Sequence, residues 1–281
     1  GVAASNFVLA TTGTGGTAPT IATPTPTGGS PSATWTVTTN ATGTTGADSG
    51  SIGLNLNGAG TVVDLVGNTL STTSFTGHAY TYDTARPTVT SIVRAVAAQS
   101  VNGGPLSWTV SFSEPVSAVA TANFGLALGG VTGTPTLSSA TAVSGIPSPT
   151  WTVTADSNGA TGTNAGSIGL NLTSSGSVAD AVGNTLSATS FTGQTYTYDT
   201  ARPTVTGVSS TLANGSYRAG QAVPITVTFS EPVNVTGTPQ LTLSTGTPST
   251  TAAGYSAGSG SSALTFTYTV TAGNTSADLD H

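Results

Sequence analysis

The sequence predicts an all-β fold, organised as tandem antiparallel β-sandwiches with almost no helix. Three observations lead to this prediction: the residue composition, a repeat at a fixed offset, and short apolar alternations separated by turn residues. Of 281 residues, 59 are Thr and 37 are Gly, whereas Glu occurs twice and Lys is absent. Thr favours the half-buried surface of a sheet and Gly favours turns, while Glu and Lys are common helix formers.

The repeat is clearest in a ten-residue string that occurs twice, as Tyr80–Val89 and as Tyr196–Val205, at an offset of 116. Its Tyr-Thr-Tyr start suits a strand with one buried face. The Asp-Thr-Ala-Arg-Pro that follows interrupts a ladder, because Pro donates no backbone hydrogen bond and restricts the residue before it. Thr-Val-Thr then begins a new strand. Each copy is therefore predicted to join two modules, with about three residues between ladders, too few for a flexible linker.

The same offset of 116 relates three further pairs of segments without a gap. These pairs are Trp35–Thr38 with Trp151–Thr154, Ser51–Leu56 with Ser167–Leu172, and Asp64–Asn68 with Asp180–Asn184. Self-similarity at a fixed period is the signature of a repeat architecture, so we expect tandem modules.

Three modules are expected, over residues 1–83, 84–199 and 200–281. The second is complete, whereas the first lacks its first strands, because Gly1–Phe7 aligns with Ala118–Phe124. The third is divergent and lacks its final strands, since no late Asp-x-x-Gly-Asn motif follows Asp278–Asp280. Either the chain is a fragment of a longer repeat protein, which we favour, or a neighbouring subunit supplies the missing strands by strand addition.

The strands of the complete module follow from apolar alternation between turn signals. The first is expected over 88–93, and the second carries Trp108, Val110 and Phe112 on one face and ends at Glu114-Pro115. Later strands are expected over 124–128, 136–137, 151–153, 168–172 and 191–198. Seven or so short strands between Gly, Pro and Asn turns predict an antiparallel β-sandwich of immunoglobulin type.

The charge pattern excludes several kinds of partner. Ten acidic and four basic residues give a net charge of −6, and the absence of clustered cations argues against nucleic acid binding. No run of about 18 apolar residues is present, so we expect no membrane insertion in this fragment. The absence of Cys excludes disulfides, thiolate metal sites and cysteine nucleophiles.

Catalysis receives little support from the sequence. His78 and His281 are the two histidines, and His78 aligns with Gln194, so we expect it on the surface of a strand. The complete module has no His, and a Ser-His-Asp set therefore cannot be built in it. We expect the protein not to be an enzyme.

Three motifs in register resemble the bacterial Ig-like repeats of giant surface proteins and biofilm-associated adhesins. They are Phe112–Val116, Asp180–Asn184 and the joint Asp199–Pro203, and the resemblance covers nearly the whole chain. It implies an extracellular, cell-surface structural protein, such as a stalk, fibre or sheath, in many members stiffened by calcium between modules. The alternative is a ligand- or carbohydrate-binding adhesive module, for which the divergent stretch Ser244–Ser262 is the first place to search.

Independently of this resemblance, the expected topology brings acidic residues together. If the first strand leaves the joint and the second returns, Glu114 lies at the joint end, where Asp83 arrives from the previous module. The turn after the next-to-last strand brings Asp180 and Asn184 to the same end. Carboxylate and other oxygen ligands from three segments suit Ca²⁺. The corresponding residues at the other joints, also candidate ligands, are Asp199, Glu231, Asp64 and Asn68.

Other interpretations of these acids stay open. Arg86 and Arg202 could pair with Glu114 and Glu231 and neutralise them without a metal. An Asp in an Asp-x-x-Gly-Asn turn can also cap its own backbone. The cofactor prediction is therefore either none or Ca²⁺. The expected partners are neighbouring modules of the same chain, or further copies in a homopolymer formed by strand addition or by edge strands that lack blunting charges.

Overall fold

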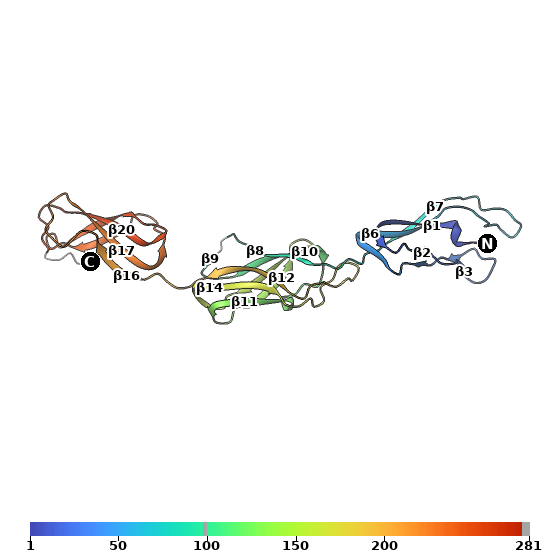
Figure 1. The fold of residues 1–281 in the computed structure, drawn as a ribbon, viewed down its shortest axis with the longest axis horizontal. Coiled ribbons are helices and arrows are strands. Elements are labelled where there is room, and N and C mark those ends of the chain that lie inside the picture. Colours follow the sequence, from blue (N-terminus) through green and yellow to red (C-terminus); the bar gives the residue numbers. More distant parts are fainter. Residues whose placement is uncertain (98–99, 277–281) are drawn as a thin grey trace. The chain divides into compact units, whose positions relative to one another are not determined.

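The computed structural model describes residues 1–97 and 100–276, and it is an all-β structure (Figure 1). In those residues the helices are two 3-10 turns, η1 (Ala4–Asn6) and η2 (Thr121–Asn123), which confirms the expectation of almost no helix. Neither has the length and apolar character needed to cross a bilayer. The chain divides into two compact units, Gly1–Thr200 and Ala201–His281.

The second repeat, residues 84–199, contains two four-stranded sheets. One has the order β12-β13-β10-β8 and the other the order β11-β14-β15-β9. Side chains from both sheets form one hydrophobic core. The strands are β8 (Val89–Arg94), β9 (Ser100–Val101), β10 (Leu106–Val116), β11 (Phe124–Thr132), β12 (Thr136–Ala142), β13 (Ser148–Asp156), β14 (Thr161–Leu172) and β15 (Phe191–Tyr198). Of these, β9 alone was not expected from the sequence.

Strand β10 links the two sheets through its alternating apolar face. Leu106, Trp108, Val110 and Phe112 are buried, whereas the residues between them are partly exposed. The indole Nε1 of Trp108 donates to the backbone oxygen of Gln194 at 2.8 Å, across the core in β15. The Trp108 ring also packs edge-on against Tyr196, with ring centroids 5.3 Å apart. Period-two alternation therefore places one face of β10 in the core, as the sequence predicted.

One detail of the sequence prediction was wrong. Strand β10 does not end at Glu114-Pro115 but continues to Val116, with a register shift in its ladder between Ser111 and Val116. Residues 82–88 lie between the assigned strands, but backbone bonds continue into this segment, from Thr84 N–H to Gly46 O and from Ser113 N–H to Thr88 O. They leave three residues, 85–87, between the two ladders, as the sequence predicted.

The first repeat, residues 1–83, has one three-stranded sheet of order β1-β6-β7. These strands are β1 (Phe7–Gly16), β6 (Thr44–Leu56) and β7 (Phe75–Thr81). The pair Phe7↔Leu56 opens its β1–β6 register just as Phe124↔Leu172 opens the β11–β14 register. The remaining strands are two-residue pairs, β2 (Thr20–Ile21) with β5 (Thr39–Asn40) and β3 (Thr25–Pro26) with β4 (Trp35–Thr36).

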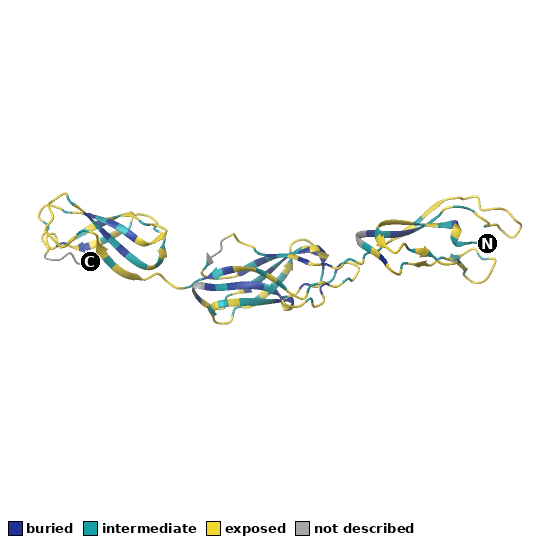
Figure 2. Ribbon diagram, in the orientation of Figure 1, coloured by how far each residue is buried: buried dark blue, intermediate teal, exposed yellow. Residues whose placement is uncertain are grey.

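The strands of residues 84–199 contain more buried positions than those of residues 1–83 (Figure 2). Trp151 is 3% exposed, whereas its counterpart Trp35 is only half-buried. Among the described side chains of residues 1–83, Ile52 is the one Val, Leu, Ile or aromatic residue that is buried. Trp151 pairs with Val110 of β10 and shares one core with residues of β8 and β10. In the described part of residues 1–83, β4 pairs with β3 and with no second strand.

The C-terminal unit, of which residues 201–276 are described, has one five-stranded antiparallel sheet of order β16-β17-β20-β19-β18. Its core combines Val223, Ile225 and Val227 of β17 with Leu264, Phe266 and Tyr268 of β20. The strands are β16 (Val205–Ser210), β17 (Ala222–Val233), β18 (Gln240–Ser244), β19 (Thr250–Ala257) and β20 (Ser261–Thr269). The expectations about Asp278–Asp280 and His281 concern residues outside the described part.

Trp35 and Trp151 form a matched pair for testing this difference in burial. Each indole Nε1 donates to a backbone oxygen three residues earlier at 3.0 Å, so the hydrogen bond is the same in both repeats. We expect Trp151→Ala to lower the free energy of unfolding of the second repeat by about 3–5 kcal/mol, and Trp35→Ala to cost its own repeat less than half as much. Hydrogen exchange of the intact chain in denaturant measures the free energy of unfolding of each repeat separately. Equal losses from the two substitutions would contradict the difference in burial.

Candidate metal centre

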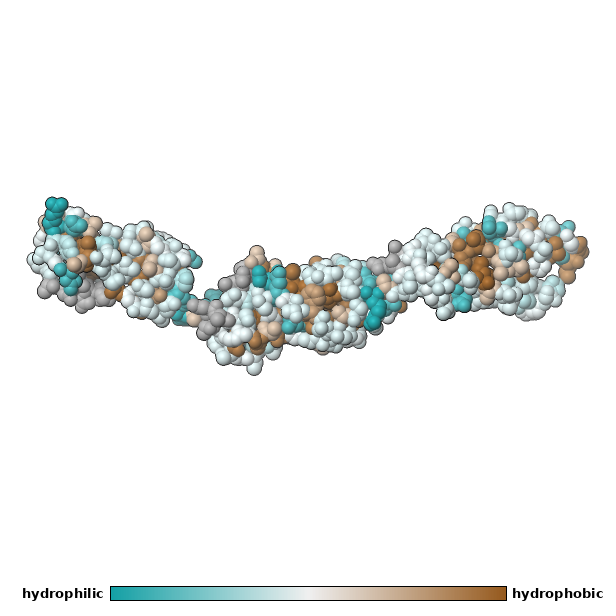
Figure 3. Space-filling view, viewed as in Figure 1, coloured by the Kyte–Doolittle hydropathy of each residue, from teal (hydrophilic) through white to brown (hydrophobic). Residues whose placement is uncertain are grey.

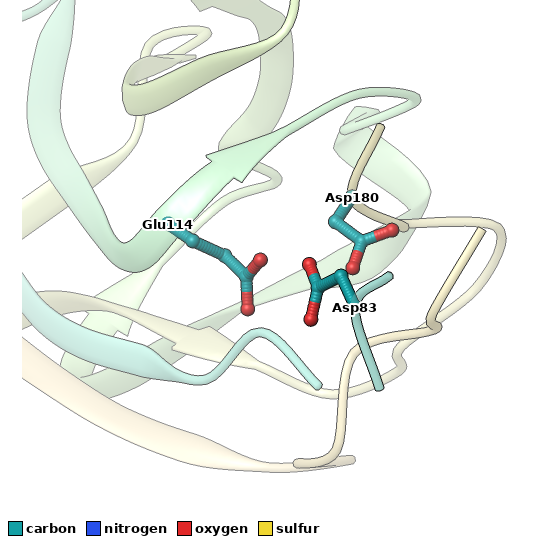
Figure 4. Close-up of side chains that lie close together, drawn as sticks. All are labelled: Asp83, Glu114 and Asp180. Atoms are coloured by element: carbon teal, nitrogen blue, oxygen red, sulfur yellow. The ribbon is translucent and has the colours of Figure 1, made fainter. Parts of the chain in front are cut away.

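Three carboxylates from three separate segments meet at one end of the second repeat. Asp83 lies in the joint after β7, Glu114 in β10, and Asp180 in the turn after β14. One oxygen of each lies within 4.8 Å of the others, and the side chains point toward one another (Figure 4). The structure therefore brings together the three acids that the predicted topology placed at the joint end.

The cluster is largely withdrawn from solvent. Glu114 is 5% exposed and Asp180 is 6% exposed, while Asp83 is half-buried. Like charges at this separation repel, and the repulsion grows as water is excluded. Hydrogen-bond donors or a cation must therefore compensate for the charge.

Asp180 receives compensation from its own turn. Its Oδ1 accepts hydrogen bonds from the backbone N–H groups of Val182, Gly183 and Asn184, at 2.9, 2.7 and 2.9 Å. Its Oδ2 accepts one from Asn184 Nδ2 at 2.8 Å. Burial alone would raise the pKa of Asp180, but these four bonds, led by that from the Asn184 side chain, hold the pKa below its ordinary value. The carboxylate thus caps its own turn.

Asn184 connects this turn to the joint. Besides its bond to Asp180, its Nδ2 donates to the backbone oxygen of Asp83 at 3.2 Å. One amide group therefore holds the turn closed and positions the residue that brings the third carboxylate. Asn184 therefore contacts two of the acids through its amide nitrogen.

Arg86 fixes the joint through backbone acceptors. Its Nε donates to Thr185 O at 2.8 Å, and one terminal nitrogen donates to Thr185 Oγ1 at 2.8 Å and to Leu186 O at 3.1 Å. The backbone N–H of Ser187 also donates to Pro87 O at 3.0 Å. The sequence analysis did not identify residues 185–187 as acceptors. They directly follow the Asp-x-x-Gly-Asn motif and so lie at the same end of the repeat.

The other predicted ligands have different surroundings. Asp64 and Asn68 form the same capped turn, with bonds of 2.8 Å from the Asn68 backbone and side chain, but Asp64 is exposed. The pKa of Asp64 is lowered chiefly by the Asn68 side chain. Among the described residues, the cluster of three acids includes Asp180 but not Asp64.

The acids of the second joint belong to different units. Asp199 is half-buried in the first unit, where its backbone N–H donates to Val101 O at 2.9 Å. Glu231 is half-buried in β17 of the C-terminal unit, and Arg202 is exposed in that unit.

The donor set at Asp83, Glu114 and Asp180 fits a hard cation. Calcium binds six to eight oxygens at about 2.3–2.6 Å, so oxygens on opposite sides of the ion lie roughly 5 Å apart. Carboxylate oxygens within 4.8 Å of one another are compatible with this geometry. Water or backbone oxygens would complete the coordination.

Comparisons of the chain with protein-family models, curated proteins and solved structures give no match.

The Asp180 turn should respond to acid in a defined direction. Because the pKa of Asp180 lies below its ordinary value of 3.8 in the folded chain, the ionised carboxylate stabilises the turn at pH values above that. This contribution is lost as the pH falls through the lowered pKa. We expect the amide resonances of residues 182–184, followed by metal-free NMR titration, to shift with a midpoint below 3.8. Asn184→Ala should raise the midpoint, and a wild-type midpoint above 3.8 would refute the assignment.

Proposed function

We propose that the chain is a non-catalytic structural repeat protein, part of an extracellular stalk, fibre or sheath of a bacterial surface adhesin. In this proposal the complete modules are immunoglobulin-like β-sandwiches in tandem, of the two-sheet kind that residues 84–199 form. Support comes from the ungapped repeat at an offset of 116 and from two sheets that share one core in residues 84–199. The observation that carries the proposal is the joint, because a stalk requires consecutive modules to be restrained rather than freely linked.

The joint is held at several points along a few residues. Its backbone oxygens at Asp83 and Pro87 accept bonds from Asn184 and Ser187, and the Arg86 side chain spans two residues of the same loop. A linker of this length without such bonds would behave as a flexible coil, so these bonds restrain the connection between the two modules. Neighbouring modules of the same chain are thus the proposed main partners, and a repeat array would distribute load over many such joints.

We further infer that Ca²⁺ binds at Asp83, Glu114 and Asp180. The donor set contains only oxygen, two of the three acids are buried, and Asp83 comes from the joint itself. Bound there, the ion would supply positive charge that offsets the mutual repulsion of the carboxylates. Because its ligands come from the joint and from the following module, binding would stiffen the connection.

A second candidate function rests on a cavity of about 460 Å³ in the C-terminal unit. Its lining includes Tyr217, Tyr268, Thr245 and Asn274, a mixture of aromatic and hydrogen-bonding groups that suits a sugar or another small polar ligand. Thr245 belongs to the divergent stretch 244–262. Binding of soluble glycans to the chain that is abolished by Tyr217→Ala would favour the adhesive-module function over the stalk function.

The stalk proposal predicts a narrow distribution of distances across the joint. The chain contains no Cys, so spin labels at Thr76→Cys and Thr192→Cys, two exposed and aligned positions, report on residues 1–83 against 84–199. We expect one narrow distribution by pulsed electron paramagnetic resonance. Arg86→Ala with Asn184→Ala should broaden it, because both anchors are lost, whereas Arg218→Ala in the C-terminal unit should not. A broad, coil-like distribution of label distances in the wild-type chain would contradict the stalk proposal.

The calcium proposal has a separate test. A ligand at about 100 times its Kd stabilises the folded state by about 2.7 kcal/mol, so Ca²⁺ should raise the melting temperature of the second repeat by several degrees. Glu114→Gln should remove this shift. Asp64→Asn, which alters the aligned turn without the other two acids, should keep it. An unchanged melting temperature between Ca²⁺ and chelator would exclude the ion and leave the stalk role standing.

A further inference from the structure

Four asparagines of the chain are each followed directly by a glycine. They are Asn57, Asn102, Asn158 and Asn214. Glycine has no side chain to shield its backbone nitrogen, and its backbone is the most permissive of any residue. In such a pair this nitrogen can attack the side-chain carbonyl carbon of the asparagine, provided that the asparagine can rotate into position. The hydrogen bonds around each pair therefore decide where this reaction proceeds in the folded chain.

Asn158 is held away from this reaction. Its Nδ2 donates to Thr134 O at 3.2 Å and to Thr136 Oγ1 at 2.7 Å. Asn158 and Gly159 both have positive φ, at 47° and 69°. The backbone N–H of Ala160 closes their turn with a hydrogen bond of 2.8 Å. Ring closure would need Asn158 to rotate out of this turn and lose these bonds. Since Asn158 is exposed, its protection comes from hydrogen bonding and not from burial.

Asn57 is held on both sides of the reacting pair. Its backbone N–H donates to Asn6 O at 2.8 Å, and the backbone oxygen of Gly58 accepts from Asn6 Nδ2 at 3.2 Å. The peptide group that must rotate lies between these two anchors. We therefore expect Asn57 to react more slowly than an unrestrained asparagine, although its side chain is exposed.

Asn102 and Asn214 lack such restraints. Both are exposed in loops, one between β9 and β10 and the other between β16 and β17. Within the described part of the chain, no hydrogen bond reaches either side-chain amide, or the backbone nitrogen of Gly103 or Gly215. A Cβ atom at either glycine would meet no atom within 4 Å, and neither glycine has a positive φ. The space that the reaction needs is therefore open at both pairs.

We propose that Asn102 and Asn214 are modification sites, at which the folded chain deamidates spontaneously to aspartate and isoaspartate. The glycine nitrogen attacks the asparagine Cγ, an N–Cγ bond forms, and the side-chain nitrogen leaves as ammonia. Water then opens the resulting succinimide at one of its two carbonyl carbons. One opening gives aspartate. The other gives isoaspartate, in which the backbone runs through the former side chain and is one carbon longer. Water is the one other reactant.

Each deamidation adds one negative charge to a chain that has few charges. The sequence carries ten acidic and four basic residues in 281. Most of the face visible in Figure 3 has intermediate hydropathy, with strongly hydrophilic groups in small patches. At position 102 the new carboxylate would follow Val101, whose backbone oxygen accepts the N–H of Asp199. Deamidation there would add charge at the end of the second repeat that carries Asp199. This inference goes beyond the stalk role and does not depend on it.

The test is incubation of the folded, full-length chain in mildly alkaline buffer, followed by peptide mapping with mass spectrometry. Alkali accelerates the reaction because the attacking nitrogen must lose its proton. We expect Asn102 and Asn214 to convert at least about tenfold faster than Asn158, which corresponds to a barrier about 1.4 kcal/mol lower. Asn57 should lie between them. In the urea-unfolded chain the four rates should become similar, which separates the effect of the fold from that of the sequence.

Two variants test the geometry. Gly103→Ala should slow conversion of Asn102, because the added methyl group shields the attacking nitrogen, and the open space around Gly103 accommodates it. Thr136→Ala should speed conversion of Asn158, since it removes one acceptor of the side-chain amide. An unchanged Asn158 rate in that variant would count against hydrogen bonding as the cause. The proposal would be overturned if Asn158 converted as fast as Asn102 and Asn214 in the folded chain, or if those two stayed intact while the unfolded chain reacted.

Discussion

Strand β10 is the constraint on which the rest of the second repeat depends. Its backbone pairs with β8 on one side and β13 on the other, and its alternating side chains fill the space against the opposite sheet. The Trp108–Tyr196 contact and the bond from the indole to Gln194 O tie that sheet to it. The same strand carries Glu114 to the acid cluster. The strand that fills the core therefore also positions one carboxylate of the acid cluster.

The comparison between the two repeats shows that the length of a strand depends on the strands that pair with it as well as on its own sequence. Trp35–Thr38 and Trp151–Thr154 are identical, yet Trp151–Thr154 lies within a nine-residue strand, whereas the strand in the other segment covers Trp35 and Thr36 alone. The conformational preferences of these residues permit both the long and the short strand. Pairing on both sides of the strand selects the longer one, because each ladder satisfies a separate set of backbone groups.

Sequence reasoning placed most strands of the second repeat and grouped Asp83, Glu114 and Asp180, because alternation and chain direction determine which end of a sheet a turn reaches. It did not identify the acceptors of Arg86, which are mainly backbone carbonyls that any residue type provides. It did predict a short joint, since backbone bonds at Thr84 and Thr88 leave three residues, 85–87, between the two ladders. Burial in the first repeat could not be predicted from alignment, because Tyr80 and Tyr196 differ only in what packs on them.

The bonds of the joint also bear on how a chain with near-identical repeats folds correctly. Strands with the same sequence can exchange between neighbouring repeats, which is a typical misfolding route of tandem proteins. The contacts of Arg86 with Thr185 and of Asn184 with Asp83 join residues 99 and 101 positions apart. They form once the joint and the late turn of the repeat have come together, so they reward closure of a whole repeat. The identical string at 199–203 carries the same groups, so these bonds by themselves do not choose between the two joints.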